Sequence, residues 1–257
     1  MRLMIYNIRY GTGGKRMLFP WSGYLRKTSK NLQEMARFIR SEDPDIIGLL
    51  EVDEGSYRSG RRNQAATLAR LLGHYHIGRS KYHHASMAHQ VPVLNKQGNA
   101  FITRDTVQAQ RFHYVEKGMK RLVIELEMPG LLVFLVHLSL GYRARHHQLD
   151  EVYALIKDAR KPVIVAGDFN APRGDRELRL FMAATGLKSA NRQSLPTFPS
   201  WSPKRQLDFV LHGDDILVRS FRLPNVLYSD HLPLVLDFDI RGAKPAEVGV
   251  KRASPAV

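Results

Sequence analysis

The segment from Pro162 to Asn170 ends an apolar run in two polar side chains. Four apolar residues follow the proline, three of them β-branched, which is typical of a short strand buried on both faces. Asp168 and Asn170 are two positions apart, so they project to the same side of an extended chain. A carboxylate is costly to bury there unless something binds it. By itself, however, the segment also fits an Asp168 that only caps a turn.

Polar groups end several other apolar runs of the chain. The first run ends at Asn7, the second at Glu51 and a later one at His137. Near the carboxyl terminus Asp208 interrupts a further apolar run, and Asp230-His231 precedes the last one. Desolvating this many polar groups costs more than a core tolerates without a ligand or mutual pairing. We therefore expect these side chains to form one site at the strand ends.

Strand and helix patterns surround these residues. Apolar stripes, with Ser29 and Asp175 as N-terminal caps, predict helices over about residues 29–41, 63–72, 143–158 and 175–185. Apolar and alternating runs predict further strands over about residues 2–8, 46–50, 98–103, 107–115, 119–127, 131–138, 206–211, 215–222 and 232–240. The segment from His74 to His89 holds five histidines without regular metal-ligand spacing, so we expect a surface loop there.

The order of the polar motifs resembles that of the endonuclease/exonuclease/phosphatase superfamily. This group includes deoxyribonucleases of the pancreatic type, apurinic-site endonucleases, bacterial sphingomyelinases and inositol polyphosphate 5-phosphatases. The matching motifs are Asn7, Leu50-Glu51-Val52, Gly98-Asn99-Ala100, Val136-His137-Leu138, Gly167-Asp168-Phe169-Asn170, Leu207-Asp208-Phe209 and Ser229-Asp230-His231. The resemblance covers about residues 2–240 and implies an α/β fold, a four-layer α/β sandwich in which two packed mixed β-sheets are flanked by helices.

The resemblance also implies a metal and an attacking water. Glu51 would ligate Mg²⁺ or Mn²⁺, since hard oxygen ligands suit hard ions. Asn7 would lie beside the metal, and Asp230 would support the metal or the His231 loop. Asp168 would orient or deprotonate the water that attacks phosphorus.

The remaining residues would bind the phosphate by the same resemblance. His231 would contact it as an imidazolium, oriented by Asp208. Asn170 would hold a phosphate oxygen, and His137 would donate a hydrogen bond to one. Arg121 lies in a predicted strand where some relatives carry a basic residue, and it would also reach the phosphate.

Two departures from the family pattern indicate which branch of the superfamily the chain resembles. Apurinic-site endonucleases usually carry an acid where this chain has Arg9, and an aromatic residue where it has His137. Both positions resemble the deoxyribonuclease and sphingomyelinase branches instead. The chain also resembles a broad set of uncharacterised bacterial members. We expect one domain over residues 1–240 and a flexible basic tail over residues 241–257.

Composition limits the compartment and the chemistry. The chain has 257 residues and no cysteine, which excludes disulfides, thiolate metal ligands and a thiol nucleophile. The first apolar run is too short for a signal peptide, and no stretch approaches the roughly 20 apolar residues that span a bilayer. We expect a cytoplasmic protein. No protein partner is inferred, and we expect a monomer.

The charge predicts a polyanionic partner. The formal net charge is +15, which attracts nucleic acid or an anionic membrane surface. The first hypothesis is therefore a metal-dependent phosphodiesterase acting on nucleic acid. The second is a phospholipid or inositol-phosphate hydrolase, with the apolar loop Met17–Trp21 inserted at a membrane. The third is a nucleic-acid-binding protein without catalysis, which the paired acid and histidine groups argue against.

Overall fold

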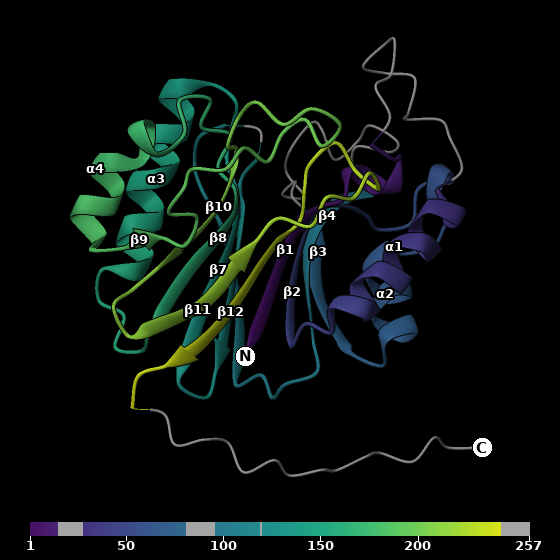
Figure 1. The fold of residues 1–257 in the computed structure, drawn as a ribbon, viewed down its shortest axis with the longest axis horizontal. Coiled ribbons are helices and arrows are strands. Elements are labelled where there is room, and N and C mark those ends of the chain that lie inside the picture. The colour runs from purple at the N-terminus through teal and green to yellow at the C-terminus, as the bar shows by residue number, and fades with distance from the viewer. Residues whose placement is uncertain (15–27, 81–95, 119, 243–257) are drawn as a thin grey trace.

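A computed structural model describes residues 1–14, 28–80, 96–118 and 120–242. The predicted apolar loop Met17–Trp21, the histidines beyond residue 80 and most of the predicted carboxyl-terminal tail lie outside these ranges. Within them the chain forms two six-stranded mixed β-sheets. Each sheet is covered on its outer face by a pair of helices, so that four layers stack (Figure 1). The predicted four-layer α/β sandwich is therefore confirmed.

The first sheet holds both ends of the described chain. Its strand order is β11-β12-β1-β2-β4-β3, and helices α1 (Ser29–Glu42) and α2 (Gln64–Leu72) cover it. Strands β1 and β2 are parallel and are joined through α1, as a crossover between parallel strands requires. The strands are β1 (Arg2–Asn7), β2 (Ile46–Asp53), β3 (Tyr75–Ser80), β4 (Gln97–Thr103), β11 (Ile216–Arg222) and β12 (Leu234–Ile240).

The second sheet repeats this plan. Its order is β5-β6-β7-β8-β10-β9, and helices α3 (Tyr142–Ile156) and α4 (Asp175–Thr185) cover it. Here β7 and β8 are the parallel pair, joined through α3. The strands are β5 (Ala109–Tyr114), β6 (Leu122–Met128), β7 (Leu131–His137), β8 (Val163–Asp168), β9 (Lys188–Ser189) and β10 (Asp208–His212).

Strand alternation sends the polar side chains into the space between the sheets. In β7, Val133 and Leu135 belong to the inter-sheet core, and His137 lies two positions further on the same face. In β8, Ile164 and Ala166 are followed in the same way by Asp168. The inter-sheet layer is therefore aliphatic along most of its length and becomes polar at one edge.

Several local predictions need correction. Helix α1 is capped at Thr28 and α4 at Gly174, not at Ser29 and Asp175, and neither cap is made by a side chain. The histidine-rich segment begins as strand β3 through Ser80 rather than as a loop, because its backbone pairs with β4. The two-residue strand β9 was not predicted, since so short a segment carries no periodicity.

Candidate active site

Asp168 is the centre of a polar cluster between the two sheets. It ends β8, and its strand neighbours are His137 in β7 and Asp208 in β10. The Oδ2 atom of Asp168 accepts a hydrogen bond from Asn7 Nδ2 at 3.2 Å and lies 3.3 Å from His137 Nε2. Its Oδ1 atom accepts a bond from the backbone N–H of Asn170 at 2.9 Å. The Asp168 carboxylate thus contacts residues from both sheets.

The charges around Asp168 keep it ionised. Burial alone would raise the pKa of this carboxyl. The hydrogen bond with His137 and the charges of His231 and Lys120 outweigh the burial and hold the pKa well below its usual range. Asp168 is therefore an acceptor for hydrogen bonds at neutral pH, as an acid that orients a water must be.

His231 lies on the other side of Asp168 and is paired with Asp208. The distance from His231 Nδ1 to Asp208 Oδ2 is 2.8 Å, and both side chains are buried. Burial opposes the protonated ring, but the carboxylates of Asp208, Asp168 and Asp230 outweigh it and raise the pKa of His231 to about 10. At neutral pH His231 is therefore an imidazolium, which is the state that neutralises a phosphate.

One loop holds this pair in place. Thr197 Oγ1 donates to Asp208 Oδ2 at 2.6 Å, and the ring of Phe198 lies 4.9 Å from the ring of His231. Ser200 binds the carbonyl of Ser229 through its hydroxyl at 2.6 Å. The proline- and serine-rich loop before β10 therefore fixes the orientation of the imidazolium.

Glu51 enters the site through a break in strand pairing. The register of β2 against β4 shifts between Leu49 and Val52, and Glu51 has a φ of 53°. Such a β-bulge re-aims a side chain and bends the strand. Glu51 Oε1 consequently lies 3.8 Å from His137 Nε2, whereas Asp53 turns away and accepts the backbone N–H groups of residues 55 and 56.

Lys120 and His137 face Glu51 from the second sheet. Lys120 Nζ lies 3.8 Å from Glu51 Oε1 and contacts His137 Nε2. Burial lowers the pKa of His137, and the Lys120 charge lowers it further, to about 4. His137 is therefore neutral at physiological pH, and Lys120 supplies the positive charge on this side of the site.

The other predicted site residues have distinct positions. Asp230 Oδ2 forms an ion pair with Arg9 Nε at 3.3 Å, so this acid is linked to the end of β1. Asn170 donates its amide to the carbonyl of Leu138 at 2.9 Å, which joins the loops after β8 and β7. The roles that the resemblance implies for Asp230 and Asn170 remain predictions.

Lys120, not Arg121, occupies the position predicted for a basic residue. Arg121 Nε donates to the carbonyl of Val115, and within the described residues no ion pair or hydrogen bond joins Arg121 to the cluster. Strand alternation could have predicted that Lys120 points into the site. Leu122 and Ile124 face the inter-sheet core, and Lys120, two residues before Leu122, projects to the same face.

Asn99 is a second residue to which sequence reasoning gave no role. It lies in β4 beside the bulge of Glu51, on the face that carries Phe101 into the inter-sheet core. Its side chain is 1% exposed, and neither amide atom has a hydrogen-bond partner among the described residues. A buried amide in that state is suited to a ligand or water.

The oxygen donors fit a divalent cation. Asp208 Oδ1 is buried and has no hydrogen-bond partner within the described residues. One potential ligand atom each from Asp168, Asp208 and His231 lie within 4.8 Å of one another. Because the raised pKa of His231 keeps its ring protonated, the carboxylate oxygens here and at Glu51 are the better ligands, and they suit Mg²⁺ or Mn²⁺.

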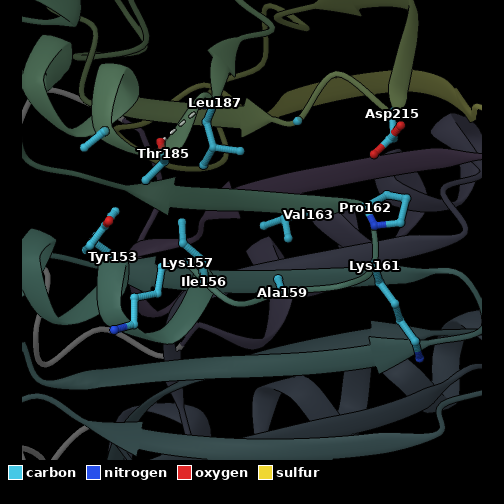
Figure 2. Close-up of a pocket in the computed structure, with 12 residues that line it drawn as sticks. Tyr153, Ile156, Lys157, Ala159, Lys161, Pro162, Val163, Thr185, Leu187 and Asp215 are labelled. Carbon is cyan, nitrogen blue, oxygen red and sulfur yellow. Dashed lines mark hydrogen bonds between the residues drawn. The ribbon is translucent and has the colours of Figure 1, made fainter.

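A cavity at the opposite end of the second sheet differs from this cluster. It has a volume of about 280 Å³ and lies between the ends of α3 and α4 and the start of β8 (Figure 2). Its lining mixes aliphatic side chains, among them Ile156, Val163 and Leu187, with the charged side chains of Lys157, Lys161 and Asp215. Lys161, at its margin, already binds Glu127 at 2.7 Å. The cavity therefore has no part in the chemistry at Asp168.

A protein-family model matches most of the chain. The model of the Endonuclease/Exonuclease/phosphatase family matches residues 4–231, which includes the whole cluster from Asn7 to His231. No curated protein matches the chain.

Solved structures share the fold at low sequence identity. A functionally unknown conserved protein from Enterococcus faecalis V583 is similar with a TM-score of 0.72 and 15% identity, over 94% of this chain and 100% of that chain. An endonuclease/exonuclease/phosphatase from Beutenbergia cavernae DSM 12333 is similar with a TM-score of 0.71 and 23% identity, over 94% and 72% of the two chains. The 3′ phosphatase NExo from Neisseria, bound to a product DNA hairpin, is similar with a TM-score of 0.64 and 15% identity, over 93% of this chain and 99% of that chain.

Proposed function

The chain belongs to the endonuclease/exonuclease/phosphatase family, and from this premise we propose that it is a metal-dependent phosphodiesterase that hydrolyses nucleic acid. Membership makes it a phosphoesterase of this superfamily; the substrate and the metal are the proposal. The observation that carries it is one buried site in which ligand atoms of Asp168 and of the His231–Asp208 pair lie within 4.8 Å of one another, with Asp168 ionised and His231 protonated.

The two groups suit the two demands of phosphodiester hydrolysis. Asp168 accepts a hydrogen bond from a water and orients it toward phosphorus. As the new P–O bond forms, the proton of the water passes to Asp168, the ester P–O bond breaks, and the leaving oxygen takes a proton from solvent. The His231 imidazolium, held by Asp208, and the ammonium of Lys120 neutralise the negative charge on the phosphoryl oxygens. Asn7 keeps the Asp168 carboxylate in place through its 3.2 Å hydrogen bond.

The metal has donors on both sides of Asp168. Glu51, Asp168 and the unpartnered oxygen of Asp208 would hold Mg²⁺ or Mn²⁺, which supplies neutralisation of phosphoryl charge when bound. Neutral His137 lies between Glu51 and Asp168. Its Nε2 atom already faces Asp168 Oδ2 and Lys120 Nζ, so a hydrogen bond from His137 to a phosphate oxygen remains a prediction.

The surface charge supports nucleic acid as the substrate. A net charge of +15 attracts a polyanion, and the Neisseria neighbour is described as bound to DNA. Lipid hydrolysis was suggested by the apolar segment Met17–Trp21, which lies outside the described residues. No helix in the described ranges is long and apolar enough to cross a membrane.

The test compares four substrates under three metal conditions. Bis-(p-nitrophenyl) phosphate, p-nitrophenyl phosphate, plasmid DNA and sphingomyelin are each incubated with Mg²⁺, Mn²⁺ or EDTA. We expect turnover of the diester and of DNA with metal, loss of it in EDTA, and loss in Asp168→Ala and His231→Ala. Asp214→Ala, which removes an exposed carboxylate at the far end of β10, is the matched control.

The outcomes separate the hypotheses. Metal-dependent cleavage of sphingomyelin alone would replace nucleic acid with a lipid substrate. DNA binding without turnover of any substrate would contradict a catalytic role.

A further inference from the structure

A basic groove lies beside the active site, outside the residues assigned to catalysis. It has a volume of about 510 Å³ and runs between the start of α4 and the segment 204–206. Four exposed cationic side chains line it: Arg173, Arg176, Lys204 and Arg205. Within the described part of the chain, none of the four forms an ion pair with a carboxylate. Their charges are therefore available to a ligand.

The groove continues directly from the catalytic edge of the second sheet. Its two walls leave the ends of β8 and β10, which stay joined by the bond from Phe169 N to Leu207 O at 2.9 Å. Gln206 is two residues from Asp208, a separation of at most about 7 Å along the chain. A ligand that reaches the Asp208–His231 pair thus has its neighbouring portion at the groove.

The wall that carries Lys204 and Arg205 is fixed to the active site. The backbone of Arg205 donates to the carbonyl of Phe198 at 2.9 Å and accepts from its N–H at 3.0 Å. Phe198 in turn packs against His231. The backbone that carries the two cations is therefore anchored to the residue that packs against the His231 imidazolium.

A buried amide in the lining points independently to a ligand. Gln206 is 6% exposed, and neither its Nε2 nor its Oε1 has a hydrogen-bond partner among the described residues. Both atoms belong to a residue that lines the groove. The one carboxylate in the lining, Asp175, accepts a hydrogen bond from Ser194 at 2.6 Å through Oδ2, while its Oδ1 has no partner among the described residues. The four cations therefore outnumber a single carboxylate.

We propose that this groove binds a phosphate of the nucleic-acid chain next to the phosphate being cleaved, with Arg176 and Arg205 as its main contacts. The inference rests on the proposed function, since it gives the substrate a direction across the site. Four cations exceed what one small phosphate monoester needs. A lipid surface would favour apolar side chains, and among the lining residues only Pro172 is apolar apart from Gly174.

The experiment measures binding without catalysis, so that it stands apart from the test of turnover. Affinity for a fluorescent duplex DNA is measured by anisotropy in EDTA at several salt concentrations. The proteins are the unmodified chain, Arg176→Gln/Arg205→Gln, and Lys157→Gln/Arg160→Gln. The last pair removes the same charge at exposed sites near the cavity of Figure 2, at the other end of the sheet.

We expect a selective effect in the groove variant. Its Kd rises about tenfold, and the slope of log K against log salt concentration falls by about 2, roughly one unit per lost phosphate contact. The control pair keeps the slope of the unmodified chain. Equal slopes of log K against log salt concentration in the two double variants would contradict phosphate binding in the groove. Failure of hydrolysis in the substrate test, with the selective loss of binding intact, would overturn only the proposed function.

Discussion

The two histidines of the candidate active site are both buried and differ in charge state. His137 is neutral, with its pKa lowered to about 4, and His231 is protonated, with its pKa raised to about 10. Burial acts in the same direction on both rings, toward the neutral form. The difference therefore comes from the neighbours, since Lys120 contacts His137 while Asp208 contacts His231.

Because of this difference, the two sides of the site supply positive charge from different residues. In the proposed function the His231 side would hold a fixed cation against phosphate, supported by the loop before β10. The His137 side takes its cation from Lys120 and leaves the imidazole neutral beside Glu51. A site in which both rings were protonated would neutralise its own carboxylates, and one in which both were neutral would lose charge complementarity to a phosphodiester.

The largest expected effect comes from breaking the His231 pair. In Asp208→Asn the carboxylate that raises the pKa of His231 is lost, so the pKa falls from about 10 toward 6.5. We expect kcat/KM to fall roughly 100- to 1,000-fold, the usual range for loss of one preorganised group that neutralises charge in the transition state. NMR titration of the His231 ring and steady-state kinetics check this.

Asp214→Asn serves as the control for that change, because Asp214 is exposed and binds Lys188 far from the cluster. A His231 titration that stays near 10 in Asp208→Asn would show that Asp168 and Asp230 suffice to hold the proton.

A smaller effect is expected on the His137 side. Lys120→Met removes the charge that faces Glu51 and His137, so the pKa of His137 rises above about 4. The loss of one charged contact to phosphate, worth about 1.5–3 kcal/mol, predicts a KM increase of roughly 10- to 100-fold. Lys117→Met, in the same loop but exposed, is the matched control. Equal KM values for the two variants would remove Lys120 from phosphate binding.

The two histidines also predict the pH of greatest stability. As the pH falls from 6.5 toward 4, the unfolded chain protonates His137 before the folded chain does, so the free energy of unfolding decreases. The raised pKa of His231 contributes stability that is complete below 6.5 and is lost as the pH rises toward 10. Together they place the maximum near pH 6.5.

Urea unfolding at about pH 5, 6.5 and 9 measures this maximum. His137→Gln should flatten the acid side of the curve and His231→Gln the alkaline side. An unchanged alkaline side in His231→Gln would mean that His231 is not protonated in the folded chain.

The sequence predicted the fold and much of the cluster because both depend on local patterns. The buried strands that end at Asn7, His137 and Asp168 are visible as apolar runs, and parallel strands bring their carboxyl ends to one edge. The ordered motifs supplied Glu51, Asp208 and His231 through the family resemblance.

The remainder depends on contacts between distant segments. The bulge at Glu51 arises from pairing with β4, so the regular alternation of a strand does not predict where the Glu51 side chain points. Arg121 was chosen through the family resemblance, which does not show which way a side chain faces, whereas Lys120 lies on the same strand face as Leu122 and Ile124. The groove at Gln206 joins two segments that lie about thirty residues apart, and no sequence pattern relates them.

The smallest expected effect concerns Gln148, which joins the two loops that carry Lys120 and follow His137. It is fully buried and accepts the N–H of Ser139 at 2.8 Å. Its Nε2 donates to the carbonyls of Lys117 and Lys120 at 2.7 and 2.8 Å. Gln148 is therefore a positioning residue that sets where the Lys120 charge lies relative to the neutral imidazole.

Gln148→Met keeps the side-chain volume and removes all three hydrogen bonds. We expect unfolding free energy to fall by about 1–3 kcal/mol, since buried partners are left unpaired. Gln64→Met is the matched control, because Gln64 is equally buried and makes three bonds, to Asp53, Tyr10 and Thr28. Both variants lose stability, but only Gln148→Met should raise the pKa of His137 by NMR, in the same direction as Lys120→Met. If the pKa of His137 is the same in the two glutamine variants, Gln148 supports the fold but does not influence the charge state of His137.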